Sequence, residues 1–398
     1  MHVLVIPSWY PDTPDDVKGV FFRDQAMALS GLGHKVGVIA LSLMSVRTLF
    51  RSRKARNRAS VSYEADNGVA TYRKSIFATL PRIPYGNFWL YRHQLSRLLE
   101  QYVKEHGRPD VIHAHSALYA GAASVSLGAD LDIPVVVTEH SSVYARGYYA
   151  GWQLRLAETA FSHASGCICV SPALGALLEN LIPVTSGRWR WIPNVVAERF
   201  CNMESQAGAA SSRITFLNLA MMTENKGQSD LIAAFHDFQA LVPESELLLG
   251  GDGPARSVLE GQVHDMGLSG KVRFLGVVPP DEVPGLLARV DVMVIASHYE
   301  TFGVVAAEAL MAGLPVIATR CGGPESIVLE GDGELVSAGA PDELMKAMHK
   351  VTRELGHYDR HGIASRAQSR FSGVSVANRL TQEYERVLTD YAAGKGAS

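Results

Sequence analysis

The chain has 398 residues, which is long for a single hydrophobic core, so the length predicts two domains. The composition is that of an ordinary globular protein, with 47% hydrophobic and 19% charged residues, and the formal net charge of -3 argues against a dedicated nucleic-acid binder. The four cysteines form no Cys-x2-Cys pair, which indicates reduced thiols rather than a zinc site or a disulfide framework.

The first residues, 1–7, already have the pattern of a strand, without a basic stretch followed by a long apolar core. We therefore expect no signal peptide. No uncharged run of about eighteen apolar residues occurs, so we expect no membrane-spanning helix. Together with the cysteine pattern, these features predict a cytoplasmic protein.

Short apolar runs alternate with longer helical patterns along the chain, which is typical of parallel α/β layers. The predicted elements of the first half are strand 3–6, helix 19–32, and strands 35–40, 111–113, 135–138 and 166–170. Those of the second half are strand 214–219, helix 228–241, strands 246–249 and 290–296, a helix from about 303 to 313, strand 316–318 and a last helix.

The new start at residue 214 repeats the strand, loop and helix of the N-terminus, so it predicts two Rossmann-like domains. We place the first domain at 1–195 and the second at 196–373, with a small, polar linker segment near 205–212. The last helix, 374–392, has no strand after it, and the tail beyond it has the composition of a frayed end.

Two carboxylates, Glu300 and Glu308, lie eight residues apart where a predicted strand gives way to a helix. The backbone amides of Phe302, Gly303 and Val304 would lie at the N-terminus of that helix, where they can hold an anion. Glu308 would lie about two turns further on, where a carboxylate can accept two hydrogen bonds from a vicinal diol. A phosphate cradle beside a diol acceptor suits a nucleotide sugar.

The string from Glu300 to Glu308 closely resembles the Glu-x(7)-Glu signature of the retaining glycosyltransferases of family four, which have the GT-B architecture. The resemblance covers nearly the whole chain. It implies an α/β fold of two Rossmann-like domains facing across a cleft, an acceptor-side domain first and a donor-binding domain second. The C-terminal helix would return to the first domain. The implied reaction moves a sugar from a nucleotide diphosphate sugar to a hydroxyl acceptor with retention of anomeric configuration.

Further strings in the second domain support this resemblance. Lys226 and Gly227 follow the first strand of that domain, where a Lys-Gly pair of the family contacts the donor diphosphate. The family often has an arginine six residues before this lysine, and here that position is Ala220, so the diphosphate would depend more on Lys226 and the helix amides. Gly253 lies in a turn that resembles the one bordering the family's nucleotide pocket.

In the first domain, Gly19 matches a family glycine whose amide approaches the donor phosphate. Arg23, one turn further, could contact an acceptor phosphate or an aspartate of the same domain. His140 follows a predicted strand and matches the histidine that faces the transferred sugar. His115 ends the neighbouring strand and is a candidate contact for the acceptor, because ligands bind at the carboxyl ends of parallel strands.

The predicted site therefore has three groups of residues. The catalytic candidates are His140, Lys226 and Glu300. The donor-binding candidates are Gly19, Lys226, Gly253, Glu300, Thr301, Phe302, Gly303, Val304 and Glu308, and the acceptor candidates are Arg23 and His115. Lys226 and the amides near Gly303 would stabilise the departing diphosphate without a protein nucleophile. No Asp-x-Asp motif follows a strand, so we expect no metal ion and no cofactor besides the donor.

The acceptor is the least determined part of this prediction. The basic run 47–58 is either a solvated loop or a surface for anionic lipid headgroups or a phosphorylated acceptor, and the aromatic segments 85–91 and 144–152 could share that face. The second interpretation predicts a polyprenyl-linked or glycan acceptor at the inner membrane face, as in exopolysaccharide or lipopolysaccharide assembly. A soluble acceptor is the alternative.

Two other functions remain open at this point. A non-hydrolysing sugar-nucleotide 2-epimerase shares the architecture and acts on the nucleotide sugar itself. A catalytically silent sugar-nucleotide-binding partner of an assembly complex would be consistent with Ala220, although intact Glu300, Glu308 and Lys226 favour transfer.

Overall fold

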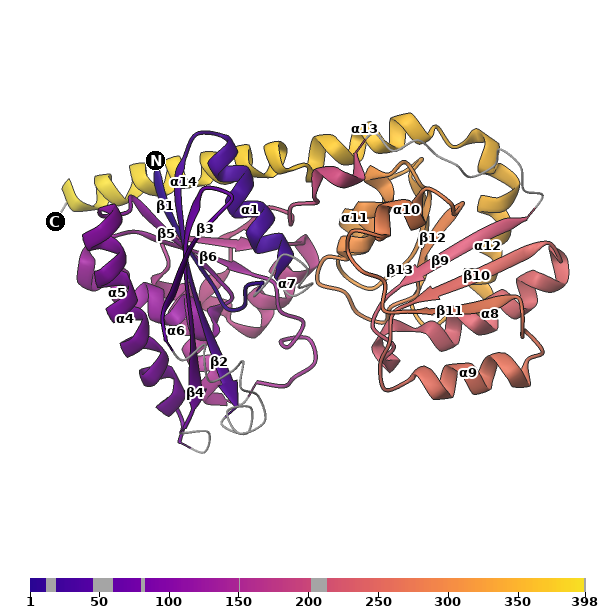
Figure 1. Ribbon diagram of the computed structural model, residues 1–398, viewed down its shortest axis with the longest axis horizontal. Coiled ribbons are helices and arrows are strands. Elements are labelled where there is room, and N and C mark those ends of the chain that lie inside the picture. The colour runs from indigo at the N-terminus through magenta and orange to yellow at the C-terminus, as the bar shows by residue number, and fades with distance from the viewer. Residues whose placement is uncertain (12–18, 46–59, 80–82, 150, 202–212, 397–398) are drawn as a thin grey trace. The chain divides into compact units, whose positions relative to one another are not determined.

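The computed structural model describes residues 1–11, 19–45, 60–79, 83–149, 151–201 and 213–396 (Figure 1). The chain divides into two compact units, which we call unit 1 and unit 2. Unit 1 contains Met1–Val195 and Gly373–Ser398, and unit 2 contains Val196–Ser372. Each unit has a sheet between layers of helices, so the α/β prediction is confirmed. The basic run 47–58 lies outside the described residues.

In the described part of unit 1 the sheet has eight strands in the order β3-β4-β2-β1-β5-β6-β7-β8. All neighbours are parallel except β3 and β4, which form an antiparallel hairpin. The strands are β1 (His2–Pro7), β2 (Lys35–Ser45), β3 (Ser62–Asp66), β4 (Val69–Ala78), β5 (Val111–His115), β6 (Val135–Glu139), β7 (Gly166–Cys169) and β8 (Trp189–Trp191).

Helices cover both faces of this sheet, because its central strands are apolar on both sides. They are α1 (Val20–Gly31), α4 (Gly86–His106), α5 (Ala122–Leu131), α6 (Gly151–His163), α7 (Pro172–Leu181) and α14 (Gly373–Gly396). Val3 and Val5 belong to a core cluster with residues of α1 and α14, which pack against each other. Helix α4 packs on β2 and β4. There an added Cβ at Gly37 would lie 2.0 Å from the Tyr102 hydroxyl, so the strand and the helix approach closely.

In unit 2 the described strands form one parallel sheet in the order β11-β10-β9-β12-β13-β14. They are β9 (Ile214–Leu219), β10 (Ser245–Gly250), β11 (Val272–Gly276), β12 (Val292–Ile295), β13 (Val316–Arg320) and β14 (Gly333–Ser337). Counted within the unit, this order is 3-2-1-4-5-6, that of a doubly wound dinucleotide-binding fold. The order in which strands are added to the sheet reverses between β9 and β12, and ligands of such folds bind at that switch point.

The helices of unit 2 also lie on both faces of the sheet. They are α8 (Gln228–Leu241), α9 (Arg256–Asp265), α10 (Val283–Leu287), α11 (Val304–Met311), α12 (Pro341–Glu354) and α13 (Arg360–Phe371). Phe216 of β9 meets Phe238 of α8 edge to face, with ring centroids 5.1 Å apart, in a cluster that also contains residues of α12. Helices α11 and α13 pack against each other and α11 against β12 and β13.

The structure corrects several predicted bounds. Strand β2 runs to Ser45 instead of Ala40, because β4 pairs with it in register from Gly37 to Ser45. The strand expected at 290–296 is limited to Val292–Ile295. Helix α14 continues to Gly396 rather than ending near 392. Among the described residues, no helix combines the length and apolar content needed to cross a membrane.

The β3–β4 hairpin was not predicted, although the sequence carries its signal. Asn67 and Gly68 form a two-residue loop with φ values of 48° and 85°. Asn-Gly is the preferred pair for this type of tight turn, because both residues tolerate positive φ. Strand β3 has only five residues, and polar residues interrupt the apolar pattern of β4, so the hydrophobic pattern alone did not identify two strands.

Gly227 provides a test of the packing at the switch point of unit 2. Its φ is 63°, and an added Cβ would lie 1.9 Å from the carbonyl oxygen of Ala296, in the loop after β12. We expect Gly227→Ala to lower the unfolding free energy of unit 2 by on the order of 3 kcal/mol, because both the conformation and the backbone contact become unfavourable. Urea unfolding followed by circular dichroism measures this change.

Gly261→Ala is the matched control, since a Cβ at this exposed position of α9 meets nothing within 4 Å. Alanine in a helix is favoured over glycine, so this variant should be at least as stable as the wild type. Equal stability of the two variants would contradict the close approach described for Gly227.

Candidate functional site

Lys226 and Glu300 meet at the switch point of the unit 2 sheet. Lys226 follows β9 and Glu300 follows β12, and these strands are neighbours. The Lys226 Nζ donates to Glu300 Oε1 at 2.5 Å, and the two side chains are 25% and 16% exposed. Residues that are 74 positions apart in the sequence therefore form one half-buried ion pair at the edge where ligands bind.

Two hydroxyl groups stabilise the position of Glu300, one by bonding to its carboxylate and one by bonding to the backbone of the same loop. Ser297 Oγ donates to Glu300 Oε1 at 2.8 Å, and Thr319 Oγ1 of β13 donates to the carbonyl oxygen of Ser297 at 2.5 Å. The Glu300 backbone pairs with the segment after β13, receiving a hydrogen bond from the Gly323 amide at 2.8 Å. Both the side chain and the backbone of Glu300 are thus fixed by neighbouring strands.

The loops after β9, β10 and β12 pack on each other through backbone contacts. The amide of His298 donates to the Asn225 carbonyl at 2.8 Å, and Asn225 Nδ2 donates to the Tyr299 carbonyl at 3.0 Å. At Gly253, where φ is 159°, a Cβ would lie 2.4 Å from the Met222 carbonyl oxygen. Gly253 therefore lies against the loop that carries Lys226, as expected for a turn that borders the same site.

The segment predicted to hold an anion forms the N-terminus of helix α11. Gly303 caps α11 with a φ of 94°, and the amide of Ala306 donates to the Gly303 carbonyl at 2.9 Å. The amides of Gly303 and Val304 come at the start of the helix, where backbone N–H groups have no partner within the helix itself. Thr301 is half-buried in the loop that leads to this start.

The side chains of Phe302 and Glu308 differ in how deeply they are buried. Phe302 is 2% exposed and packs edge to face on Phe371, so its side chain belongs to the core and its backbone alone could contact a ligand. Glu308 is the fifth residue of α11, which places it about one and a half turns beyond Gly303 rather than two. It is half-buried, as a carboxylate facing a bound ligand could be.

In unit 1, Gly19 and Arg23 are fixed by local packing. Gly19 precedes α1 with a φ of 74°, and a Cβ there would lie 2.9 Å from the Trp9 ring. Arg23 makes a bidentate ion pair with Asp66 of β3, with nitrogen–oxygen distances of 2.6 and 2.8 Å. Of the two contacts expected for Arg23, the structure shows the one with an aspartate of the same domain.

Three histidines form a buried cluster at the carboxyl ends of β5 and β6. His115 Nδ1 and His140 Nε2 are 3.0 Å apart, and the rings of His113 and His115 lie 4.2 Å apart on the same side of β5. Burial lowers the pKa of His113 and of His140 to about 3, and it lowers the pKa of His115 well below the usual value. All three imidazoles are therefore neutral near pH 7, when each has one donor and one acceptor nitrogen.

Two buried side chains around this cluster were missed by the sequence analysis. Glu139 accepts hydrogen bonds from the amides of Ala117, His140 and Ser141, each at 2.9 Å, and so fixes the backbone next to His140. Burial raises the pKa of this carboxyl group. The hydroxyl of Tyr384, from α14, lies 2.6 Å from His113 Nδ1. Glu139 could have been found from the sequence, because it is a carboxylate at the end of an apolar strand. No sequence pattern near Tyr384 indicates its contact with His113.

The cysteines do not provide a nucleophile. All four are free thiols, and burial raises the pKa of Cys167 to about 11 and that of both Cys169 and Cys321 to about 12. The thiolate is the reactive form, so these groups are unreactive at neutral pH. Among the described residues, no group of three His, Cys, Asp or Glu side chains is arranged to hold a metal ion.

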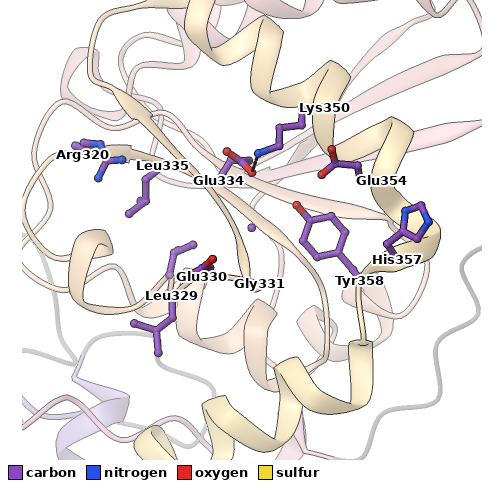
Figure 2. Close-up of a pocket in the computed structure, with 12 residues that line it drawn as sticks. Arg320, Leu329, Glu330, Gly331, Glu334, Leu335, Lys350, Glu354, His357 and Tyr358 are labelled. Carbon is purple, nitrogen blue, oxygen red and sulfur yellow. Dashed lines mark ion pairs between the residues drawn. The ribbon is translucent and has the colours of Figure 1, made fainter.

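A separate hollow of about 530 Å³ lies along β14 in unit 2. Figure 2 shows Glu334 and Lys350 joined beside it by an ion pair of 2.6 Å, with Glu354, His357 and Tyr358 on the same side. None of the predicted site residues lines this hollow. The location of the donor site therefore rests on the strand topology and the Lys226–Glu300 pair.

Two family models match the chain, one in each half. The model "Glycosyltransferase Family 4" matches residues 19–199, and the model "Glycosyl transferases group 1" matches residues 202–368. The chain is a glycosyltransferase of the family-four type. The predicted family and the prediction of an enzyme are confirmed.

Known proteins similar to this glycosyltransferase agree with the assignment. A putative teichuronic acid biosynthesis glycosyltransferase, TuaC of Bacillus subtilis, is 25% identical over 366 residues, which cover 89% of this chain and 90% of the relative. Sucrose-phosphate synthase from Thermosynechococcus elongatus superposes with a TM-score of 0.78 at 21% identity, covering 98% of this chain and 100% of that chain. The structure of Anabaena Alr3699/HepE in complex with UDP-glucose gives a TM-score of 0.71 at 18% identity, covering 97% and 100%. At these identities the two structures show the GT-B fold of the glycosyltransferase.

The buried histidines of the glycosyltransferase predict an acid-sensitive unit 1. Histidines that are neutral in the folded state take up protons on unfolding below their ordinary pKa of about 6.5, so stability is present above that pH and is lost as the pH falls toward 3. Within this window each such histidine lowers the free energy of unfolding by about 1.4 kcal/mol for each unit by which the pH falls. We expect His140→Gln to reduce the slope between pH 6 and pH 5 by that amount.

Urea unfolding at a series of pH values measures the slope, and tryptophan fluorescence reports on unit 1 because all five tryptophans lie within residues 1–195. His264→Gln, on the exposed face of α9 in unit 2, is the control and should leave the slope unchanged. A wild-type slope in the His140 variant would show that this imidazole is charged in the folded protein.

Proposed function

We propose that this enzyme is a retaining glycosyltransferase that moves a sugar from a nucleotide diphosphate sugar to a hydroxyl acceptor. The observation that carries the proposal is the Lys226–Glu300 ion pair at the switch point of unit 2, beside the N-terminus of α11. A cation and a helix N-terminus together suit a diphosphate, and a carboxylate suits sugar hydroxyls.

In this proposal each donor contact uses a group whose position is fixed. Lys226 and the amides of Gly303 and Val304 would hold the diphosphate, and Gly253 would border the nucleotide. Glu308 would accept hydrogen bonds from the ribose diol. The UDP-glucose complex of the similar Anabaena protein supports a nucleotide-sugar donor for this chain.

The proposed chemistry is electrostatic stabilisation of the leaving group. Negative charge builds up on the diphosphate as the glycosidic bond breaks, and Lys226 with the α11 amides would stabilise it without reorganising. Glu300 would orient Lys226 and contact a donor hydroxyl. His140, being neutral, would give the transferred sugar a hydrogen bond rather than a charge. No metal ion and no protein nucleophile take part in this scheme.

The proposed acceptor is a glycan or a polyprenyl-linked glycan in polysaccharide assembly, including exopolysaccharide or lipopolysaccharide, with peripheral contact to an anionic membrane. The name of the similar Bacillus subtilis protein, which refers to teichuronic acid biosynthesis, supports a polysaccharide pathway. One aromatic contact fits a shared surface in unit 1, because Tyr85 and Trp152 meet edge to face at 5.3 Å. These rings come from the two aromatic segments noted in the sequence.

Donor binding by unit 2 is the first test. Nucleotide diphosphate sugars with uridine, guanosine and adenosine bases are screened by thermal shift with and without EDTA, since a ligand that binds the folded state raises the melting temperature. We expect one donor to stabilise the enzyme equally in both conditions. Calorimetry should then show at least tenfold weaker binding for Lys226→Gln and for Glu308→Ala.

Lys346→Gln and Glu244→Gln change the same charges at exposed positions of unit 2 and should bind the donor like the wild type. Wild-type affinity in Glu308→Ala would remove that residue from the site. A donor effect that disappears with EDTA would overturn the metal-independent scheme.

Anomeric configuration separates transfer with retention from the alternatives. With the donor identified, proton NMR of the product formed on a simple sugar acceptor should show the same anomeric configuration as the donor. An inverted product would contradict the proposed mechanism, and conversion of the donor sugar without any acceptor would identify the 2-epimerase.

A further inference from the structure

A small polar pocket lies on one face of the β2–β4–β3 part of the unit 1 sheet. Its volume is about 120 Å³, and its polar lining includes Tyr10, Ser42, Ser62, Glu64, Arg73, Lys74 and Ser75. None of these residues belongs to the site proposed above.

The strand register explains why these side chains point into one pocket. Ser42 of β2 pairs with Ser75 of β4, and Arg73 of β4 pairs with Ser62 of β3. Residues that pair directly, and those two positions apart on a strand, share a face of the sheet. Lys74 also lines the pocket, and its Nζ donates to Gln94 of α4 at 2.7 Å.

The pocket opens at the same edge of the sheet as the histidine cluster. Strands β1 and β5 end side by side, with Pro7 opposite His115, and the Ser8 hydroxyl donates to the His115 carbonyl at 2.7 Å. Tyr10 follows two residues later and lines the pocket, while β2 and β4 continue to Ser45 and Ala78. A ligand in this pocket would therefore lie at the carboxyl end of the sheet.

Both cationic side chains that line the pocket, Arg73 and Lys74, already have hydrogen-bond partners, which argues against an anion as its ligand. Arg73 pairs with Glu64 at 2.7 Å and lies 3.5 Å from Asp66, whose carboxylate also receives the bidentate contact from Arg23. Two guanidinium groups thus face two carboxylates. A phosphate would have to compete with both acids for the same arginines.

The other polar groups of the pocket are those that bind neutral sugars. The Glu64 carboxylate is 59% exposed and can accept hydrogen bonds from two neighbouring hydroxyls. Serine hydroxyls both donate and accept, so Ser42, Ser62 and Ser75 fit hydroxyl groups in either role. Burial and the nearby Asp66 raise the pKa of Tyr10, so its hydroxyl keeps its proton and can donate.

We propose that this pocket is an acceptor subsite that holds one neutral sugar unit of a glycan acceptor. The inference rests on the proposed glycosyl transfer and deepens it, because it makes the acceptor a saccharide rather than a small non-sugar alcohol. The enzyme would recognise the acceptor through hydroxyl groups at the edge of the unit 1 sheet.

The test uses the full chain and ligands that need no donor. Methyl α-glucoside, methyl α-galactoside, methyl α-mannoside and N-acetylglucosamine are titrated by ligand-observed NMR, with inorganic phosphate as the anionic probe. We expect at least one sugar to bind in the millimolar range. Glu64→Gln keeps the side-chain shape, and Ser42→Val places a methyl group in the pocket. Each variant should weaken the binding of that sugar at least tenfold.

Glu158→Gln changes the same charge on the exposed face of α6 and should bind the sugar like the wild type. All variants are checked for an unchanged melting temperature and for wild-type affinity toward UDP. The proposal is overturned if no sugar binds the wild type, if phosphate alone binds, or if neither pocket variant weakens the binding of the sugar. Sugar binding that depends on the pocket, in a chain that binds no nucleotide sugar, would instead overturn the proposed transfer and leave the pocket standing.

Discussion

The close approach of the loops after β9 and β12 is the constraint on which the proposed donor site depends. Gly227 lets the first loop lie against the carbonyl of Ala296, and the contact brings Lys226 within 2.5 Å of Glu300. A side chain at Gly227 would separate the two loops and with them the two charges. The ion pair is therefore a consequence of backbone packing at the switch point, where a doubly wound sheet leaves room for a ligand.

Unit 1 holds several of its buried polar groups by a different principle, namely hydrogen bonds within the core, although His115 Nε2 has no hydrogen-bond partner among the described residues. His113 is bonded to Thr138 on one side and to Tyr384 of the C-terminal helix on the other, at 2.7 and 2.6 Å. Glu139 accepts hydrogen bonds from three backbone amides. Buried polar groups are tolerated when they are paired, and they then fix one geometry. The neutral His115–His140 pair lies beside these groups at the carboxyl edge of the sheet, with 3.0 Å between His115 Nδ1 and His140 Nε2.

Both units place their chemistry at the carboxyl ends of parallel strands, yet the two edges differ in character. The edge in unit 2 combines a cation with helix amides, which favours a diphosphate. The edge in unit 1 combines neutral imidazoles with hydroxyls and balanced charges around Arg73, which favours sugar hydroxyls. This division matches a reaction in which one substrate is highly charged and the other is a neutral glycan.

The sequence by itself determined part of the strands and helices and the chemistry that lies close in the chain. Alternating apolar and amphipathic segments predicted the two α/β domains, and helix α8 was predicted to the residue, because its amphipathic pattern is local and Gly227 marks its start. The Glu300–Glu308 string predicted a helix N-terminus because the signal spans nine consecutive residues.

Only the tertiary structure decided which distant residues meet. The partners of Lys226, Arg23 and His113 are 74, 43 and 271 residues away, and such pairs form through sheet order and helix packing, which no local pattern encodes. The Ser42–Ser75 face depends in the same way on strand register, which pairing fixes only when the sheet has formed.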